Sequence, residues 1–213
     1  MFKDDTAIIL IECQNEFCSP DGALYGAVKE VLVENNVIEN IRATIEKLRG
    51  KCHIIHIPIC FSKGYPEIGK NPYGILKGVV DGKAFIKGSK GSEFYNDLAP
   101  EENDIIIEGK RTLCAFGSSN IDRVLRANNI KKIALAGFLT NVCVEGTARS
   151  AYDQGYEVYI LSDCTATTSI EEQQYTVEKI FPLFAKVVTH DEFINMVLED
   201  RETLATVERA YYT

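Results

Sequence analysis

GFLTNVCVEGTARS, residues 137–150, is the stretch that decides how this chain folds. It follows the short apolar run KIALA, which is typical of a buried strand. Beyond it, apolar residues recur at the spacing of a helix face, and Thr140 or Asn141 is suited to cap that helix. Cys143 is therefore predicted to lie where a strand has just ended and a helix begins.

The predicted position of Cys143 suits a nucleophile. The first turn of a helix carries unpaired N–H groups and a positive partial charge, which lower the pKa of a thiol placed there. The thiolate is the reactive form of cysteine. The alternative is a small buried hydrophobic residue, which is what most single cysteines are. The position alone leaves both interpretations open, and the other motifs favour the first.

The composition is that of a globular protein with one domain over residues 1–213. The chain is long enough for a sizeable core, and 46% of its residues are hydrophobic and 25% charged. Its formal net charge of −8 argues against a nucleic-acid partner, since such binding relies on basic surfaces. The longest apolar runs have the length of strands, so we expect no membrane span.

The cysteines and the N-terminal sequence indicate a cytoplasmic protein. The number of cysteines, seven, is odd, and no two of them form a C-x-x-C pair. Neither a disulfide framework nor a zinc knuckle is therefore expected. The first residues, MFKDD, have no signal-peptide pattern. These observations fit a reducing, cytosol-like compartment.

Strands and helices alternate along the sequence. Apolar runs predict six strands, at 7–11, 54–59, 104–107, 132–136, 157–161 and 185–188. A helix is expected over about 28–49 and another after Ser118 or Ser119, and capping-box patterns begin two more at Ser169 and Thr189. This alternation predicts an α/β fold, a doubly wound parallel sheet with helices on both faces. Ligands of such sheets bind outside the carboxyl ends of the strands.

The alternation is interrupted at residues 60–103, a segment called the excursion below. It contains seven glycines and three prolines. A long irregular segment in a compact domain is usually functional, often as a lid or a pocket wall. A contact between subunits is the alternative, and the two interpretations are compatible.

Three side chains with useful chemistry follow three of the predicted strands. Glu12 closes the first strand, Lys110 lies just past the third, and Cys143 follows the fourth. We expect all three at the carboxyl edge of the sheet. A carboxylate can take the thiol proton and later give it to a leaving amine, while an ammonium stabilises thiolate and carboxylate. Taken singly, Glu12 could be a polar residue at a strand end and Lys110 a surface lysine.

Four motifs resemble the isochorismatase-like cysteine hydrolases, the superfamily of nicotinamidases, N-carbamoylsarcosine amidohydrolase and ureidoacrylate amidohydrolase. Residues 11–17, IECQNEF, are similar to the h-D-x-Q-N-D/E-F opening, and 109–116, GKRTLCAF, to the lysine motif. Residues 137–144, GFLTNVCV, resemble G-x-x-T-x-x-C-V, the most specific motif. Residues 162–167, SDCTAT, are similar to the D-A-x-A-T segment after the fifth strand. The resemblance covers nearly the whole chain.

The resemblance implies a Rossmann-like, six-stranded sheet in the order 3-2-1-4-5-6. It also implies that Cys143 is the nucleophile, Lys110 the activating cation and Glu12 the acid/base. A cis peptide bond before Leu139 is implied as well. That bond would turn the N–H of Leu139, beside the N–H of Cys143, toward the substrate oxygen as an oxyanion hole.

Two comparisons with the family bear on the reaction. The family's acid/base is usually aspartate, and Glu12 is one methylene longer. Members that hydrolyse vinyl ethers such as isochorismate lack the cysteine, so Cys143 favours hydrolysis of a C–N bond in a small amide or ureide, through a thioester. Another acyl or ether substrate is an alternative. The competing hypothesis is a fold relative that binds a small molecule or partner without turnover.

No metal or cofactor is predicted, and the resemblance implies a homo-oligomer, a dimer or tetramer. Metal-dependent nicotinamidases use an aspartate and histidines just past the second strand, whereas the excursion contains no histidine. His53 and His56 are three apart in a strand and point to opposite faces, and His190 lies far along the chain. Four aromatic residues are proposed as pocket walls, although each is equally suited to the core: Phe17, Tyr73, Phe116 and Phe138.

Overall fold

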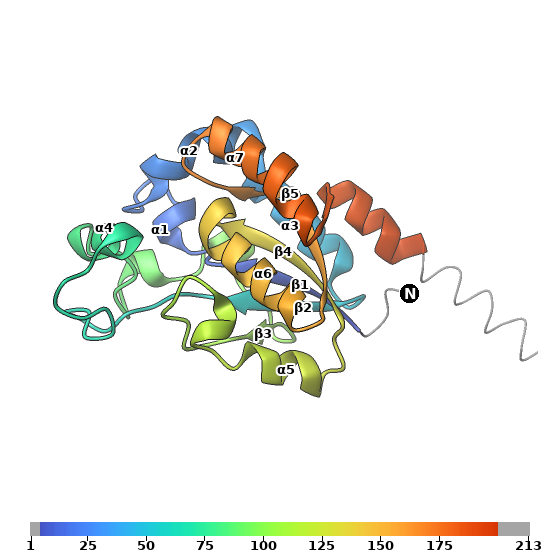
Figure 1. Ribbon diagram of the computed structural model, residues 1–213, viewed down its shortest axis with the longest axis horizontal. Coiled ribbons are helices and arrows are strands. Elements are labelled where there is room, and N and C mark those ends of the chain that lie inside the picture. The colour runs from blue at the N-terminus through green and yellow to red at the C-terminus, as the bar shows by residue number, and fades with distance from the viewer. Residues whose placement is uncertain (1–4, 200–213) are drawn as a thin grey trace, which may run out of the picture.

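The computed structural model describes residues 5–199, which form a six-stranded sheet with helices against both faces (Figure 1). The strand order is β3-β2-β1-β4-β5-β6, as the family resemblance implies, and all neighbouring strands are parallel. The strands are β1 Thr6–Ile11, β2 His53–Ile57, β3 Ile105–Ile106, β4 Lys132–Phe138, β5 Glu157–Ala166 and β6 Lys186–Val188.

Helices connect these strands, as the alternation predicts. They are α1 Asn15–Cys18, α2 Tyr25–Glu34, α3 Val37–Leu48, α4 Gly74–Asp81, α5 Ile121–Ala127, α6 Glu145–Asp153 and α7 Ile170–Tyr175. A final helix covers 190–199, where the described part of the chain ends. Among the described helices, none is both long enough and apolar enough to cross a membrane.

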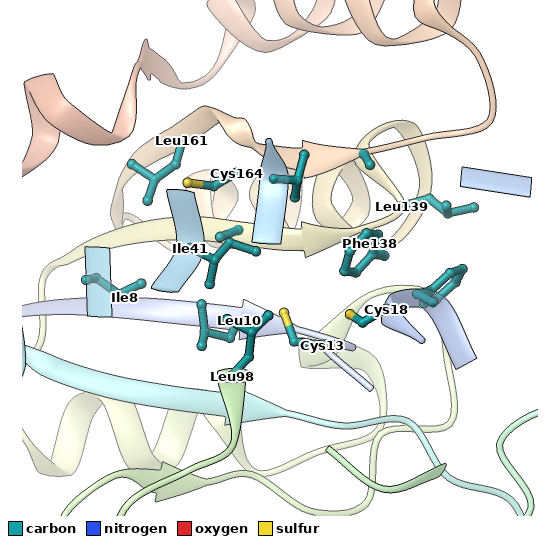
Figure 2. Packing of buried hydrophobic residues seen from close by; sticks show 14 of the residues in the cluster. Ile8, Leu10, Cys13, Cys18, Ile41, Leu98, Phe138, Leu139, Leu161 and Cys164 are labelled. Atoms are coloured by element: carbon teal, nitrogen blue, oxygen red, sulfur yellow. The ribbon is translucent and has the colours of Figure 1, made fainter. Parts of the chain in front are cut away.

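The central strand β1 is buried along its whole length because helices cover both faces of the sheet. Its side chains alternate between two cores, with Ile8 and Leu10 in the first and Ile9 and Ile11 in the second. The first core is closed by α2, α3 and the final helix, and Figure 2 shows Ile41 of α3 above Ile8 and Leu10 of β1. The second core is closed by α5 and α6. The sheet is therefore doubly wound.

The single helix predicted over about 28–49 is wrong, since the chain forms α2 and α3 with a turn between them. Asn36 in this turn has a φ of 49°, a left-handed conformation in which asparagine is several-fold enriched. The apolar stripe continues across the turn because both helices pack on the same face of the sheet. Apolar spacing alone therefore did not mark the break.

Both helices predicted from capping-box patterns are present, and the second has the complete capping box. The hydroxyl of Ser169 accepts a hydrogen bond from the N–H of Glu172 at 3.2 Å and begins α7. The hydroxyl of Thr189 accepts from the N–H of Glu192 at 3.3 Å, and the Glu192 carboxylate accepts from the N–H of Thr189 at 2.8 Å. The two hydrogen bonds between Thr189 and Glu192 are reciprocal, and they lie at the start of the final helix.

Gly137 lets β1 and β4 approach each other where the two strands end. It is paired in register with Ile11 and has a φ of +112°. A Cβ atom added to it would lie 2.0 Å from the carbonyl oxygen of Ile11. That oxygen belongs to the backbone of the central strand, so it has little freedom to move aside.

We expect Gly137→Ala to lower the free energy of unfolding by about 3 kcal/mol or more, because a strained φ is combined with a backbone clash. Urea unfolding followed by circular dichroism measures the change. Gly155→Ala is the matched control, since Gly155 also has a positive φ, +86°, but an added Cβ meets nothing within 4 Å. Gly155→Ala should lower the free energy of unfolding by only about 1–2 kcal/mol. Equal losses in the two variants would contradict the clash.

Candidate active site

The three predicted site residues lie together at the carboxyl edge of the sheet. Glu12 directly follows β1, and Lys110 lies after β3, where it pairs with Ile59 in an isolated parallel bridge. Cys143 lies in a π-helical turn, Thr140–Val144, between β4 and α6. β1 lies between β2 and β4 in the sheet, and Lys110 is held beside Ile59, just past the end of β2. The segments that carry the three residues therefore meet at the end of β1.

The three side chains are buried and in contact. Their exposed fractions are 3% for Glu12, 0% for Lys110 and 4% for Cys143. The ammonium of Lys110 donates hydrogen bonds to Oε1 of Glu12 and, at 2.7 Å, to the carbonyl oxygen of Thr112. The Cys143 thiol lies close enough to both side chains for their charges to act on its pKa, which Glu12 raises and Lys110 lowers. Lys110 is therefore no surface lysine, and the longer side chain of Glu12 reaches both partners.

Burial has the largest effect on the pKa of the Cys143 thiol. It raises the pKa of the Cys143 thiol, and the charge of Glu12 raises it further against the opposing effect of Lys110. The prediction that the helix position lowers this pKa is therefore wrong, because desolvation is the larger effect. Burial would lower the pKa of Lys110, but the charge of Glu12 and its hydrogen bond to the ammonium outweigh burial and raise it. At neutral pH a protonated thiol lies beside an ammonium.

The backbone that precedes Cys143 has the shape implied by the resemblance. The peptide bond between Phe138 and Leu139 is cis, and Figure 2 shows both side chains at the end of β4. The backbone N–H of Leu139 faces the Cys143 sulfur and acts to lower the pKa of the thiol. The carbonyl of Leu139 accepts hydrogen bonds from the N–H groups of Val142 and Val144, both at 3.1 Å. The N–H of Leu139 is thus on the same side of the turn as the thiol.

Polar side chains hold the Cys143 turn against β5 and α7. The hydroxyl of Thr140 donates to Oε1 of the buried Gln173 at 2.6 Å, and the amide of Gln173 donates to the backbone of β5. The amide oxygen of Asn141 accepts from the hydroxyl of Thr167. The prediction that Thr140 or Asn141 caps the helix is wrong, since Leu139 is at the N-cap and makes no side-chain cap. The SDCTAT motif supports the turn.

The opening motif fastens the excursion to the end of β1. The buried Gln14 amide donates to the carbonyls of Ile59 at 2.9 Å and Ser92 at 2.8 Å, and it accepts from the N–H of Ile59 at 2.9 Å. The carboxylate of Glu16, also buried, accepts from the N–H of Phe85 at 3.0 Å. The polar residues of this motif therefore position the segment that follows β2.

Backbone hydrogen bonds close the base of the loop that contains α4. The N–H of Phe61 donates to the carbonyl of Phe85, and the N–H of Lys87 donates to the carbonyl of Phe61, both at 2.8 Å. The hydroxyl of Tyr65 donates to the carbonyl of Ala84 at 2.8 Å. Figure 1 shows α4 beyond the carboxyl ends of the strands. The loop is thus fixed at its base and extends over the site.

An apolar pocket with a volume of about 190 Å³ lies beside Cys143. Glu12 and Cys143 line it together with residues from α1, α2, α4 and the loops around them. Its apolar walls include Phe17, Leu24, Ile75, Leu76, Val79 and Leu139. The excursion therefore contributes a pocket wall, one of the two roles that its sequence predicts.

The aromatic residues predicted as pocket walls occupy different places. Phe17 lines the pocket, and Phe138 is buried behind it, with the two ring centroids 5.1 Å apart. Tyr73 is 87% exposed before α4, and Phe116 packs beside Tyr156 at the second core. Phe138, Tyr73 and Phe116 do not line this pocket, so these three predictions are wrong. Residue type does not tell which face of the sheet an aromatic ring will meet.

The aliphatic wall residues of α4 were not predicted. Ile75, Leu76 and Val79 line the pocket from one side of this helix. Their spacing of one, three and four residues is a helical signal inside an otherwise irregular segment. An amphipathic helix in a glycine-rich excursion is therefore the pattern that would have found them.

The histidines lie away from this pocket, and two of them, His56 and His190, have carboxylate partners. His53 and His56 lie on opposite faces of β2. His56 is buried, with Nε2 3.3 Å from Oδ2 of Asp104, and Nδ1 of His190 lies 2.6 Å from Oδ2 of Asp163. Within residues 5–199, no group of three or more His, Cys, Asp and Glu side chains is arranged to hold a metal ion.

A doubly wound sheet with a pocket at the carboxyl ends of its strands has the architecture of a ligand-binding α/β enzyme. Residues 6–192 match the Isochorismatase domain, and the chain belongs to the Isochorismatase family. It is similar to the ureidoacrylate amidohydrolase RutB of Agrobacterium fabrum, with 27% identity over 206 residues. That alignment covers 91% of this chain and 90% of the Agrobacterium protein.

Solved structures agree with this assignment. A cysteine hydrolase from Pseudomonas syringae pv. phaseolicola superposes with a TM-score of 0.80 and 25% identity, covering 92% of this chain and 93% of that one. An isochorismatase-like hydrolase from Alkaliphilus metalliredigens has a TM-score of 0.73 and 28% identity, and the match covers 90% of this chain and 98% of that one. Sequence family and fold together make this protein an isochorismatase-like hydrolase.

Proposed function

We propose that the protein hydrolyses a C–N bond of a small amide or ureide through a thioester, with Cys143 as nucleophile, Lys110 as activating cation and Glu12 as acid/base. The burial of the Cys143 thiol near the ion pair of Lys110 and Glu12, at the pocket, is the observation that carries the proposal. The names of the similar proteins, an amidohydrolase and a cysteine hydrolase, support it.

The first half-reaction forms the acyl-enzyme. Glu12 takes the thiol proton as the Cys143 sulfur attacks the carbonyl carbon, and a tetrahedral oxyanion forms. The N–H groups of Leu139 and Cys143 stabilise the oxyanion. When the intermediate collapses, the C–N bond breaks and Glu12 gives its proton to the leaving nitrogen. The products of this step are a thioester on Cys143 and a free amine or ammonia.

The second half-reaction restores the enzyme. Water attacks the thioester carbon while Glu12 takes one of its protons. The C–S bond then breaks, the acid leaves, and the sulfur regains its proton. The raised pKa of Cys143 supports this cycle, because a thiol that is protonated at rest needs a base in contact with it. Lys110 stabilises the thiolate while it exists.

Hydroxylamine trapping tests the proposal. We expect the protein to release ammonia from at least one member of a panel of small primary amides and ureides. Hydroxylamine added to the assay should divert part of the product to a hydroxamate, because it captures the thioester in place of water. Intact-mass spectrometry after acid quenching should show the acyl group on the protein, and peptide mapping should place it on Cys143.

Two outcomes would contradict the proposal. Turnover without any hydroxamate or acyl adduct would exclude the thioester. No ammonia from any amide or ureide, in a protein whose circular dichroism shows the fold, would favour the non-catalytic fold relative that binds a small molecule or partner without turnover.

The protein is further proposed to act as a homo-oligomer, a dimer or tetramer, in the cytoplasm. All seven cysteines lie in the described part of the chain and none of them is in a disulfide, which supports a reducing compartment. Exposed apolar side chains on α6 and α7, Tyr152 and Tyr175, offer surface for a subunit contact. Light scattering at micromolar concentration decides the oligomeric state.

A further inference from the structure

Resting on the proposed function, we propose that the site takes small primary amides whose acyl part is an uncharged hydrocarbon, a branched chain or a single ring. The reaction converts the amide and water into a carboxylic acid and ammonia. The C–N bond breaks, a C–O bond to the water oxygen forms, and no oxidant or reductant is required. Ureidoacrylate, named in the similar Agrobacterium protein, carries a carboxylate and falls outside this class.

The walls of the pocket are hydrocarbon on every side that the structure describes. Phe17 and Leu24 form one wall, and Ile75, Leu76 and Val79 of α4 form another. Such walls gain free energy by covering an apolar acyl group and offer a polar one no hydrogen-bond partner.

The polar side chains that line the pocket have other partners or belong to the chemistry. They are Glu12, Cys143 and Thr168, and the hydroxyl of Thr168 donates to the carboxylate of Glu172. No lysine, arginine or histidine is among the described residues that line the pocket. The carboxylate of Glu12 is the charged group on the pocket surface, and it repels a second carboxylate.

The cations nearest in sequence to the site are directed elsewhere. Lys110 is fully buried and bonded to Glu12 and to the carbonyl of Thr112. The guanidinium of Arg111 donates to the carbonyl of Lys110 at 2.7 Å and lies 3.7 Å from Glu67. Arg111 lines a different cavity, together with Lys87. A substrate carboxylate in the apolar pocket would therefore be desolvated without a counter-ion.

The size of the pocket limits the acyl group. A dry apolar cavity of about 150 Å³ holds a benzene molecule in another protein. The pocket beside Cys143 has a volume of about 190 Å³, which leaves room for a ring or a branched chain of similar size with the amide group at the sulfur. The wall made by α4 limits how long the acyl group can be.

A pair of amides with the same shape and different charge tests the inference. 4-Methylpentanamide and succinamate differ only in that an isopropyl group replaces a carboxylate at the end of the same chain. We expect the full-length enzyme to hydrolyse 4-methylpentanamide with a kcat/KM at least roughly 100-fold higher, because the carboxylate finds no partner in the pocket. Benzamide should be accepted, and ureidoacrylate should behave like succinamate.

A positive charge placed on the pocket wall should largely remove this preference. Ile75 lines the pocket and is 39% exposed, so an arginine can replace it without entering the core. We expect Ile75→Arg to lower kcat/KM for 4-methylpentanamide and raise it for succinamate, changing their ratio by roughly 100-fold. Val33→Arg is the matched control, since Val33 is 57% exposed on α2 and lies outside this pocket. The ratio of kcat/KM for 4-methylpentanamide to that for succinamate should be the same in Val33→Arg as in the wild type.

The outcomes separate the substrate class from the reaction. A wild type that hydrolyses succinamate or ureidoacrylate as well as, or better than, 4-methylpentanamide overturns the inference and leaves amide hydrolysis intact. An unchanged ratio in Ile75→Arg overturns the role of the pocket wall. Ammonia release from none of the four amides, together with no acyl adduct, contradicts the proposed function itself.

Discussion

The Cys143→Ser variant is expected to keep the fold and lose turnover, with kcat lower by roughly 10⁴-fold or more. A hydroxyl is close to a thiol in size, so a residue that is 4% exposed is replaced without a cavity. Its intrinsic reactivity is much lower, and burial already raises the pKa of the native thiol. An alkoxide in the same place is harder still to form. Ammonia release at saturating amide measures the loss.

Two companion variants define the origin of that loss. Cys52→Ser changes a cysteine just before β2, at the opposite end of that strand from the site, and should retain wild-type kcat. Cys143→Ala should bind substrate without cleaving it, seen as a rise in melting temperature when the amide is added. Turnover by Cys143→Ser near the wild-type rate would remove Cys143 from the mechanism.

The second large effect is expected for Glu12→Gln, which should lower kcat by about 10²-fold or more. The amide cannot accept the thiol proton or return it to the leaving nitrogen. The same change leaves the buried Lys110 ammonium without its carboxylate, so the free energy of unfolding should fall by about 3 kcal/mol or more. Steady-state kinetics and urea unfolding measure the two effects separately.

A double variant separates catalysis from folding. Glu12→Gln with Lys110→Met removes both members of the buried pair and keeps most of the lysine stem's packing. We expect it to regain part of the stability lost in Glu12→Gln, since replacing a buried ion pair with apolar groups is often neutral. Its activity should stay low. A double variant that regains activity along with stability would make Glu12 a structural residue.

Glu12→Asp tests the reach of the acid/base. It keeps the ionisable group but shortens the side chain by one carbon, and a misplacement near 1 Å can lower the rate by roughly 10²-fold. We expect Asp to be impaired and still better than Gln, because Glu12 contacts both the ammonium and the thiol in the native protein. Wild-type activity in Glu12→Gln would exclude proton transfer by this residue.

The sequence was sufficient for the sheet and for the meeting of three side chains. Glu12, Lys110 and Cys143 each follow a strand, and the ends of adjacent parallel strands share one edge. That rule requires no knowledge of side-chain packing. The strand order itself came from the family resemblance, because apolar runs show where strands lie and not which strands are neighbours.

Features that depend on packing between distant segments could not be predicted. The pKa of Cys143 is set by how completely α4, Phe17 and their neighbours exclude water, and no local pattern contains that information. Tyr73 and Phe116 illustrate the same limit, since one is exposed and the other joins the second core. Asn36 breaks a helix whose apolar stripe continues on both sides.

The fixed base of the loop that carries α4 has a consequence for how this enzyme can change over time. Gln14 and Glu16 hold the ends of that loop, while Ile75, Leu76 and Val79 extend from the part between them. Mutations in α4 therefore reshape the pocket without moving the atoms that break the bond. Substrate selectivity can therefore change by mutation while the catalytic residues stay the same. A few substitutions in one short helix are enough for a new substrate to be accepted.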